Sequence, residues 1–374
     1  MTGSDQLQGR PTVAVVGGGY GGVTVAKALD ETMDVVLVEP RDAFMHNVAA
    51  LRALVDPSWL PRIYFPYDKL LANGRVVRDR ATLVEPGRVV TASGEEIVAD
   101  YVVLATGSSY PFPAKTDKVD TEAAHDQVRA AHGALSEADQ VLLLGAGPVG
   151  IELAGEIKHV WPNKPIILLD VSGEVLGGPF KPELKAELRR QLADIGVEML
   201  LSSPLKAFPP TEAGKRGTFT VTTEEGSEIT ADIWFQCFGV APNSDYLGDA
   251  LAHARRADGY IEVEPTMQVV GHERVFALGD LSTADANMAA FAGLEAETVA
   301  ANITALANGS GSELTTYESM GTAIAVPVGP LGGAGQFPGQ DEIVGSDTIS
   351  DLKGKDMMVD RFQDMFGLAV AATD

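Results

Sequence analysis

The sequence has 374 residues, 45% of them hydrophobic, which is enough chain for two or three folded domains. The formal net charge of −24 disfavours binding to nucleic acid or to an anionic membrane through bulk electrostatics. Cys237 is the only cysteine, so an internal disulfide, a dithiol redox pair and a cysteine metal cluster are excluded. The six histidines are scattered, and we therefore expect no metal site.

The N-terminal stretch "MTGSDQLQGRP" has neither the apolar core of a signal peptide nor a glycine at position 2 for myristoylation. No run of 18 uninterrupted apolar residues occurs in the sequence. We therefore expect a cytoplasmic protein, a monomer or homodimer, with at most weak peripheral contact with a membrane.

The first predicted unit is a strand, a glycine-rich turn, a helix and a second strand. The strand "TVAVV" (12–16) runs into Gly17-x-Gly19-x-x-Gly22, and "DVVLVE" then ends on Glu39. The first glycine permits a tight turn, the second lets the backbone approach a pyrophosphate, and the third lets the helix pack on the strand. Glu39 is placed to accept hydrogen bonds from a ribose. The unit predicts a dinucleotide site.

A second copy of the unit contains "GAGPVGIELAGEI" (145–157), with Gly145, Gly147 and Gly150 in the same spacing. Asp170 closes the strand that follows. An acid at this position repels a 2′-phosphate, and no Arg or Lys lies between 171 and 180 to offset it, so the pattern favours NADH over NADPH.

Two acids follow the second turn on its helix, Glu152 and Glu156. Their spacing of four puts like charges on one face, where they cost a few tenths of a kcal/mol. We expect both side chains to lie beyond the phosphates and to face the nicotinamide and flavin rings.

The rest of the chain alternates strands, turns and one long helix. Short strands are predicted over 75–107 and 217–239, a strand over 274–280 and a helix over 287–308, and the glycine-rich stretch 328–339 begins a segment of different character. With two dinucleotide sites and no dithiol, the economical interpretation is a flavin in one domain and a hydride donor in the other.

Small-residue turns at strand ends support this interpretation: "ATG" (105–107), "CFGVAPN" (237–243) and "GD" (279–280). Asp280 is placed to bind flavin ribityl hydroxyls. A helix beginning near Asn287 can direct its N-terminal N–H groups at the isoalloxazine.

The motifs "VGGGYGG", "HNVAALRA", "ATGS", "GAGPVGIELAGEI", "CFGVAPN", "FALGD" and "NMAAFAG" occur in the order typical of flavoproteins with two dinucleotide-binding domains. Among these the chain is most similar to the ferroptosis-suppressor branch of the apoptosis-inducing-factor family, related to type II NADH:quinone oxidoreductases. The resemblance implies an α/β fold with two Rossmann-like domains, FAD, NADH and a quinone acceptor. It divides the chain into an FAD domain (1–112 and 262–309), an inserted NAD(P)H domain (113–261) and a C-terminal segment (310–374) that covers the active site or forms an interface.

The turns and the resemblance together assign residues to roles. The FAD positions are Gly17, Gly19, Tyr20, Gly21, Gly22, Glu39, Arg41, His46, Asn47, Thr82, Leu83, Thr106, Gly107, Gly279, Asp280, Met288 and Ala289. The nicotinamide-cofactor positions are Gly145, Gly147, Gly150, Asp170 and Gly239, with Glu156 and Glu152 as catalytic carboxylates. Arg52, Lys353 and Lys355 are expected near the acceptor.

Several alternatives stay open on the sequence. His46 is either a buried, hydrogen-bonded histidine or a flavin-pocket residue, and Arg52 is either a surface residue or a partner of one of the two helix acids. Cys237 is expected to be a buried, inert thiol. Residues 351–368 predict an amphipathic helix with Met358, Phe362, Met365 and Phe366 on one face, packed over the active site or on a dimer partner.

The leading functional hypothesis is an FAD-dependent NADH oxidoreductase that passes electrons to a small-molecule acceptor, a quinone or similar compound. A reductase of a protein electron carrier of the ferredoxin or rubredoxin type is the second hypothesis. The third is a flavin-based sensor or interaction protein that changes state when it meets NADH.

Overall fold

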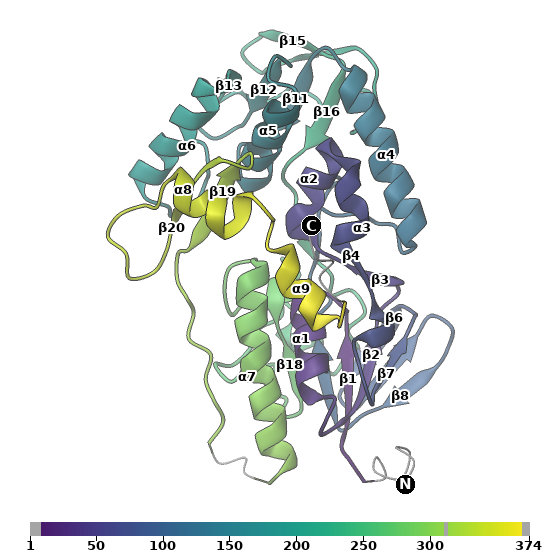
Figure 1. Cartoon of the computed structure of the whole chain (residues 1–374). Coiled ribbons are helices and arrows are strands. Elements are labelled where there is room, and N and C mark those ends of the chain that lie inside the picture. The colour runs from purple at the N-terminus through teal and green to yellow at the C-terminus, as the bar shows by residue number, and fades with distance from the viewer. Residues whose placement is uncertain (1–8, 310–312, 369–374) are drawn as a thin grey trace.

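The computed structural model describes residues 9–309 and 313–368. The first residues of the N-terminal stretch discussed above lie outside this range. The chain forms two lobes, each built on a parallel sheet, and the C-terminal segment lies across both of them (Figure 1). Within the described residues, no helix has both the length and the apolar character needed to cross a bilayer.

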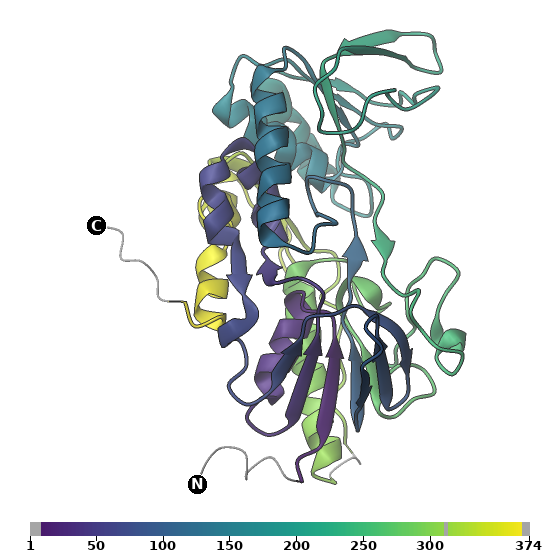
Figure 2. The ribbon, with the colours of Figure 1, turned by 90° about the vertical axis from the view of Figure 1, so that its right-hand side faces the viewer.

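The first sheet has five parallel strands in the order β18-β9-β1-β2-β5. Their bounds are β1 (Thr12–Val16), β2 (Asp34–Val38), β5 (Arg75–Val77), β9 (Tyr101–Leu104) and β18 (Val275–Ala277). β18 comes from much later in the chain, so this lobe is assembled from two separate stretches. One face is covered by α1 (Tyr20–Leu29) and α7 (Ala289–Ala307), and the other by a small antiparallel sheet of β6 (Ala81–Glu85), β7 (Arg88–Thr91) and β8 (Glu96–Val98) (Figures 1 and 2).

The second sheet has four parallel strands in the order β13-β12-β11-β16. The strands are β11 (Val141–Leu144), β12 (Ile166–Leu169), β13 (Val197–Leu200) and β16 (Ile233–Gln236). The side chains of β11 and β12 are buried on both faces, as their continuous apolar sequences require. The helices of this lobe are α4 (Thr121–Glu137), α5 (Pro148–Val160) and α6 (Pro182–Asp194), and the hairpin of β14 (Phe219–Thr222) and β15 (Glu228–Ala231) covers the opposite face.

The chain passes between the lobes through a two-stranded pair, β10 (Ser108–Ser109) with β17 (Ala241–Pro242). After β17, the buried residues Leu251, Ala254 and Ile261 join the core of the first lobe. These three residues, which lie within the stretch 113–261 that the sequence assigns to the inserted domain, therefore pack with the first lobe.

One element of the first half reaches into the second lobe. The stretch after β3 (Ala43–Met45) forms α2 (Ala50–Val55) and α3 (Leu60–Ile63) before β4 (Tyr64–Pro66) pairs back with β3. Leu51, Leu54 and Val55 on α2 belong to the buried cluster of the second lobe. α2 therefore lies against α5, the helix that carries the two acids.

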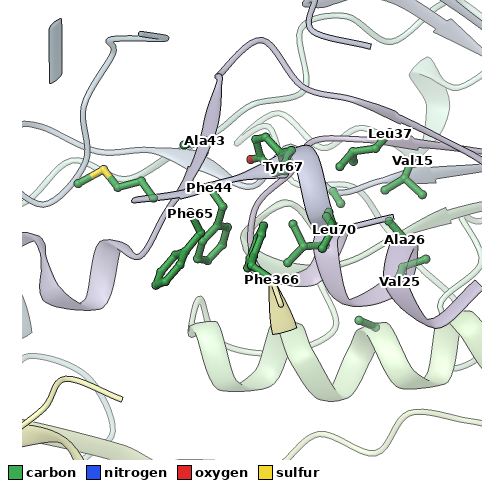
Figure 3. Packing of buried hydrophobic residues seen from close by; sticks show 14 of the residues in the cluster. Val15, Val25, Ala26, Leu37, Ala43, Phe44, Phe65, Tyr67, Leu70 and Phe366 are labelled. Atoms are coloured by element: carbon green, nitrogen blue, oxygen red, sulfur yellow. The ribbon is translucent and has the colours of Figure 1, made fainter. Parts of the chain in front are cut away.

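The C-terminal segment begins with the hairpin β19 (Ile324–Val328) and β20 (Gly332–Gln336), which packs on α5 and α6. It continues through α8 (Ser346–Ile349), a π-helical turn (Ser350–Gly354) and α9 (Val359–Met365). The single helix predicted over 351–368 is wrong, because Met357 and Met358 have φ of 54° and 60° and interrupt it. Phe362 of α9 and Phe366, the residue after it, nevertheless pack on the first lobe. Figure 3 shows the fully buried Phe366 against Phe44 and Phe65.

Candidate functional site

The first glycine turn leaves space for a ligand at one position and none at the others. A Cβ on Gly17, whose φ is 105°, would lie 2.5 Å from the Ala105 carbonyl oxygen, and one on Gly22 would lie 1.9 Å from the Gly17 oxygen. A Cβ on Gly19 would meet nothing within 4 Å. Gly19 also caps α1 without any side-chain hydrogen bond, so the first N–H groups of α1 are available to a phosphate.

The second glycine turn repeats this geometry. Gly145 has φ of 109°, a Cβ on Gly150 would lie 1.9 Å from the Gly145 oxygen, and Gly147 faces open space. Gly147 caps α5 without a side-chain bond, as Gly19 caps α1. Both turns therefore fit the diphosphate of a dinucleotide, one in each lobe.

An acid at the end of the second strand is held in the same way in both lobes. Glu39 accepts hydrogen bonds from the backbone N–H groups of Gly18, at 2.7 Å, and Arg41, at 3.0 Å. Asp170 accepts from Ala146, at 2.5 Å, and Ser172, at 2.7 Å. Each carboxylate is fixed beside its glycine turn, where a ribose would bring hydroxyl groups.

The predicted ribityl residue Asp280 has a cationic partner that the sequence reasoning missed. Lys115 lies 3.0 Å from the Asp280 carboxylate and also donates to the hydroxyl and the carbonyl of Ser108. Ser108 itself donates to Asp280 at 2.6 Å. Lys115 is the only basic residue in "ATGSSYPFPAKT", close behind the "ATG" turn, and that position was the available signal.

The "ATG" turn is held by residues that follow β17, where the chain returns from the second lobe. The Thr106 hydroxyl contacts Asn243 and Tyr246, and Gly107 has a φ of 61° with no atom within 4 Å of an added Cβ. Gly279, with φ of 70°, precedes Asp280 in a short 3₁₀ turn. Met288 caps α7, so α7 begins at Ala289, two residues after the predicted start.

His46 is a buried, doubly hydrogen-bonded histidine. Its Nδ1 lies 3.1 Å from the Tyr20 hydroxyl and its Nε2 lies 2.6 Å from the Met357 carbonyl oxygen. Because a carbonyl only accepts, Nε2 is the donor and Nδ1 accepts from Tyr20. Burial lowers the pKa of His46 to about 4, so the ring is neutral near pH 7. His46 thus ties the glycine-turn helix to the C-terminal segment.

The two acids of α5 each have a buried cation of their own. Arg52 on α2 forms a bidentate pair with Glu156, through Nε to Oε2 and through Nη2 to Oε1 at 2.8 Å, and also donates to the Gly354 carbonyl. Lys353 in the π-helical turn lies 2.8 Å from Glu152. The like charges of the helix are therefore separately compensated.

Three chain segments meet at these pairs: α2 from the first lobe, α5 from the second and the π-helical turn of the C-terminal segment. Arg52 and Glu156 are almost fully buried, with 7% and 1% of their side-chain surface exposed. Burial raises the pKa of Glu152, while Lys353 opposes this shift. We refer to Arg52, Glu152, Glu156 and Lys353 as the four-charge cluster.

Other predicted residues make contacts with residues outside the cluster. Lys355 is exposed and pairs with Asp351 at 2.5 Å. The exposed Thr82 donates to the Val90 carbonyl within the small antiparallel sheet, and its neighbour Leu83 is half-buried. A Cβ on Gly21 would lie 2.1 Å from Leu278, so Gly21 lets α1 pack closely.

The remaining predicted residues have simple placements. The Arg41 guanidinium donates to the Thr116 carbonyl at 3.2 Å, Asn47 begins a short 3₁₀ turn before α2, and Gly239 follows β16 with φ of 105°. Cys237 is buried, and burial raises its pKa to about 12, which leaves an unreactive thiol. Within residues 9–309 and 313–368, no three His, Cys, Asp or Glu side chains are grouped to hold a metal ion.

Comparisons with known proteins agree with this architecture. Residues 11–305 match the family model described as "Pyridine nucleotide-disulphide oxidoreductase". The chain is 32% identical to ferroptosis suppressor protein 1 of Taeniopygia guttata, over 95% of each chain. It is 28% identical to apoptosis-inducing factor homolog B of Dictyostelium discoideum, over 94% of this chain and 95% of that protein.

Among solved structures, the chain resembles the sulfide:quinone oxidoreductase of Aquifex aeolicus with a TM-score of 0.75 at 17% identity, covering 95% of this chain and 91% of that one. The family match covers both glycine turns and the discontinuous first lobe. The chain is therefore a member of the pyridine nucleotide-disulphide oxidoreductase family, with homology to ferroptosis suppressor protein 1 along almost its whole length.

Proposed function

We propose that this flavin oxidoreductase takes hydride from NADH and passes the electrons to a quinone or a similar small acceptor. The observation that carries the proposal is the four-charge cluster, a buried and charge-balanced group where the two dinucleotide lobes and the C-terminal segment meet. A catalyst that joins two cofactors and an acceptor needs such a junction, because the reacting rings must be held in fixed proximity.

The two lobes hold the two dinucleotides in this proposal. The turn at Gly19, with Glu39 and Asp280, binds FAD, and the turn at Gly147, with Asp170, binds NADH. When bound, FAD supplies the redox chemistry by accepting hydride and releasing electrons to the acceptor. The protein contributes binding, orientation and fixed charge.

Asp170 supports NADH as the donor. Both oxygens of its carboxylate are fixed by backbone N–H groups, so the negative charge stays beside the position of the adenosine ribose. A 2′-phosphate at that position would be repelled, and residues 171–180 contain no arginine or lysine to offset the repulsion.

The acceptor assignment draws on the relatives and on the C-terminal segment. A solved structure with the same fold is described as a sulfide:quinone oxidoreductase. In this chain, the C-terminal segment brings Lys353 to Glu152 and the Gly354 carbonyl to Arg52. We propose that this segment borders the acceptor and that Arg52 and Lys353 keep the junction electrically neutral for an uncharged quinone.

The proposal is tested by comparing wild type with Glu156→Gln after reconstitution with FAD. Gln keeps the shape but removes the charge that Arg52 needs, so we expect a folded, yellow protein with slower flavin reduction by NADH or slower reoxidation by quinone in stopped flow. Glu183→Gln, at an exposed position of α6, is the matched control and should behave as wild type. Unchanged kinetics in Glu156→Gln would remove Glu156 from the catalytic machinery.

The same experiment separates the rival functions. If NADH reduces the flavin but no quinone reoxidises it rapidly, the acceptor is a protein carrier or the protein is a sensor. If NADH does not reduce the flavin, the oxidoreductase proposal fails.

A further inference from the structure

In the part of the chain that the structure describes, one buried carboxyl group has no salt-bridge partner and accepts hydrogen bonds from the turn that presents Asp280. Glu295, on α7, is 1% exposed. Its Oε2 accepts a hydrogen bond from the Gly279 N–H at 2.5 Å and lies 3.5 Å from the Ser282 hydroxyl. Glu295 therefore holds both ends of the turn Gly279–Ser282, which contains Asp280.

The charged groups around Glu295 are acidic. Asp280 and Asp285 both disfavour a further negative charge on Glu295. Tyr317 faces the same region through its hydrogen bond to Asp285 at 2.9 Å. The one charged residue of α1, which packs along α7, is Lys27, and its ammonium group donates to the Leu70 carbonyl instead. Among the described residues no salt bridge is formed by Glu295, whereas Asp280 has Lys115.

The turn held by Glu295 is close to the first glycine motif. A Cβ on Gly21 would lie 2.1 Å from Leu278 and 3.2 Å from the Ala292 carbonyl oxygen, so α1 touches α7 and the residue that directly precedes the turn. A charge on Glu295 would thus act on the turn that presents Asp280 and on the N-terminal half of α7, both assigned above to the flavin.

We infer that Glu295 is a positioning residue that takes up a proton when FAD binds and thereby couples the affinity for FAD to pH. The inference rests on the proposed function, since it assumes that FAD binds at this turn. With Glu295 neutral, its carbonyl oxygen still accepts from Gly279, and Glu295 itself adds no negative charge on the side of the FAD diphosphate. With Glu295 ionised, three carboxylates lie near one another, and among the three, within residues 9–309 and 313–368, only Asp280 forms a salt bridge, with Lys115.

The direction of the effect follows from the environment. Burial raises the pKa of Glu295 to about 7, with Asp285 and Asp280 adding to the shift and the Gly279 N–H opposing it. FAD binding adds negative charge and should raise this pKa further. Affinity should therefore be highest below pH 7 and fall as the pH rises through 7.

The test is a titration of apoprotein with FAD from pH 5.5 to 8.5, followed by flavin fluorescence. For wild type we expect the Kd to rise about three- to tenfold over this range, which corresponds to a pKa change on binding of about half a unit to one unit. Glu295→Gln should give a nearly constant Kd equal to that of wild type at low pH. Glu297→Gln removes a charge from an exposed position of α7 and should titrate as wild type does.

A second measurement does not depend on the variant. Calorimetry of wild type near pH 7 in two buffers of different ionisation enthalpy should show uptake of a fraction of a proton when FAD binds. A Kd of wild type that does not vary with pH, or a Glu295→Gln variant that keeps the wild-type pH dependence, would overturn the inference while FAD binding itself stands. Absence of FAD binding at every pH would instead overturn the proposed function and this inference together.

Discussion

Replacing Arg52 by Met should destabilise the protein strongly, because it leaves the Glu156 carboxylate buried and unpaired. Arg52 makes two hydrogen bonds to Glu156 and one to Gly354, and only 1% of the Glu156 side chain is exposed. Breaking a buried pair by removing one partner costs about 3–5 kcal/mol. On the usual scale of roughly 2–4 °C per kcal/mol, the unfolding midpoint should fall by about 6–20 °C.

The assay is thermal unfolding of wild type, Arg52→Met and the double variant Arg52→Met/Glu156→Gln. The double variant removes the orphaned charge and should recover at least about half of the loss. Arg62→Met is the matched control. The guanidinium groups of Arg52 and Arg62 both lie over the Trp59 ring, at 5.1 and 4.3 Å from its centre, but Arg62 is exposed, so its replacement should cost only about 0.5–1 kcal/mol. A loss for Arg52→Met as small as that for Arg62→Met, or no recovery in the double variant, would refute the role given to the pair.

Four further predictions follow from the same structure. Gly150→Ala should fail to fold stably in a thermal unfolding assay, because its Cβ would lie 1.9 Å from the Gly145 carbonyl oxygen. Gly147→Ala should fold normally, since its Cβ meets no protein atom within 4 Å, but should bind NADH weakly in a titration. Asp170→Asn should lower the preference for NADH over NADPH, measured as a ratio of kcat/KM, by about tenfold, equivalent to about 1.4 kcal/mol. Phe366→Ala should destabilise the packing of the C-terminal segment by about 3–5 kcal/mol, seen as faster proteolysis after β20. Glu295 has a pKa of about 7 in the folded protein against an ordinary value of 4.5. Its contribution to the free energy of unfolding is therefore fully present below pH 4.5 and is lost as the pH rises through 7. Relative to wild type, the free energy of unfolding of Glu295→Gln in urea should rise by up to about 3 kcal/mol by pH 8.

The strand–turn–helix units could be predicted from the sequence because their signals are local. The apolar β-branched run 12–16 and the glycines at 17, 19 and 22 specify a buried strand and a tight turn without reference to the rest of the chain. The break in the C-terminal helix could not be predicted in this way. Met357 and Met358 have ordinary helix-forming side chains, and their positive φ is fixed by tertiary contacts such as the His46 hydrogen bond to the Met357 carbonyl.

The site was partly visible in the sequence for the same reason. Glu152 and Glu156 could be singled out because two like charges on one helix face require compensation, but the sequence could not show which cations compensate them. Arg52 and Lys353 are 104 and 201 residues away from their partners, so only the assembled fold pairs them. Lys115 and Glu295 were missed because each becomes distinctive only through its distance to the Asp280 turn.

We propose that both lobes hold cofactors and that electrons pass from NADH through FAD to a small acceptor. Anaerobic mixing of the FAD-loaded protein with NADH, followed by quinone, tests this claim most directly. We predict that NADH bleaches the visible flavin absorbance and that quinone restores it within the turnover time. A flavin that stays oxidised in the presence of NADH would contradict the account.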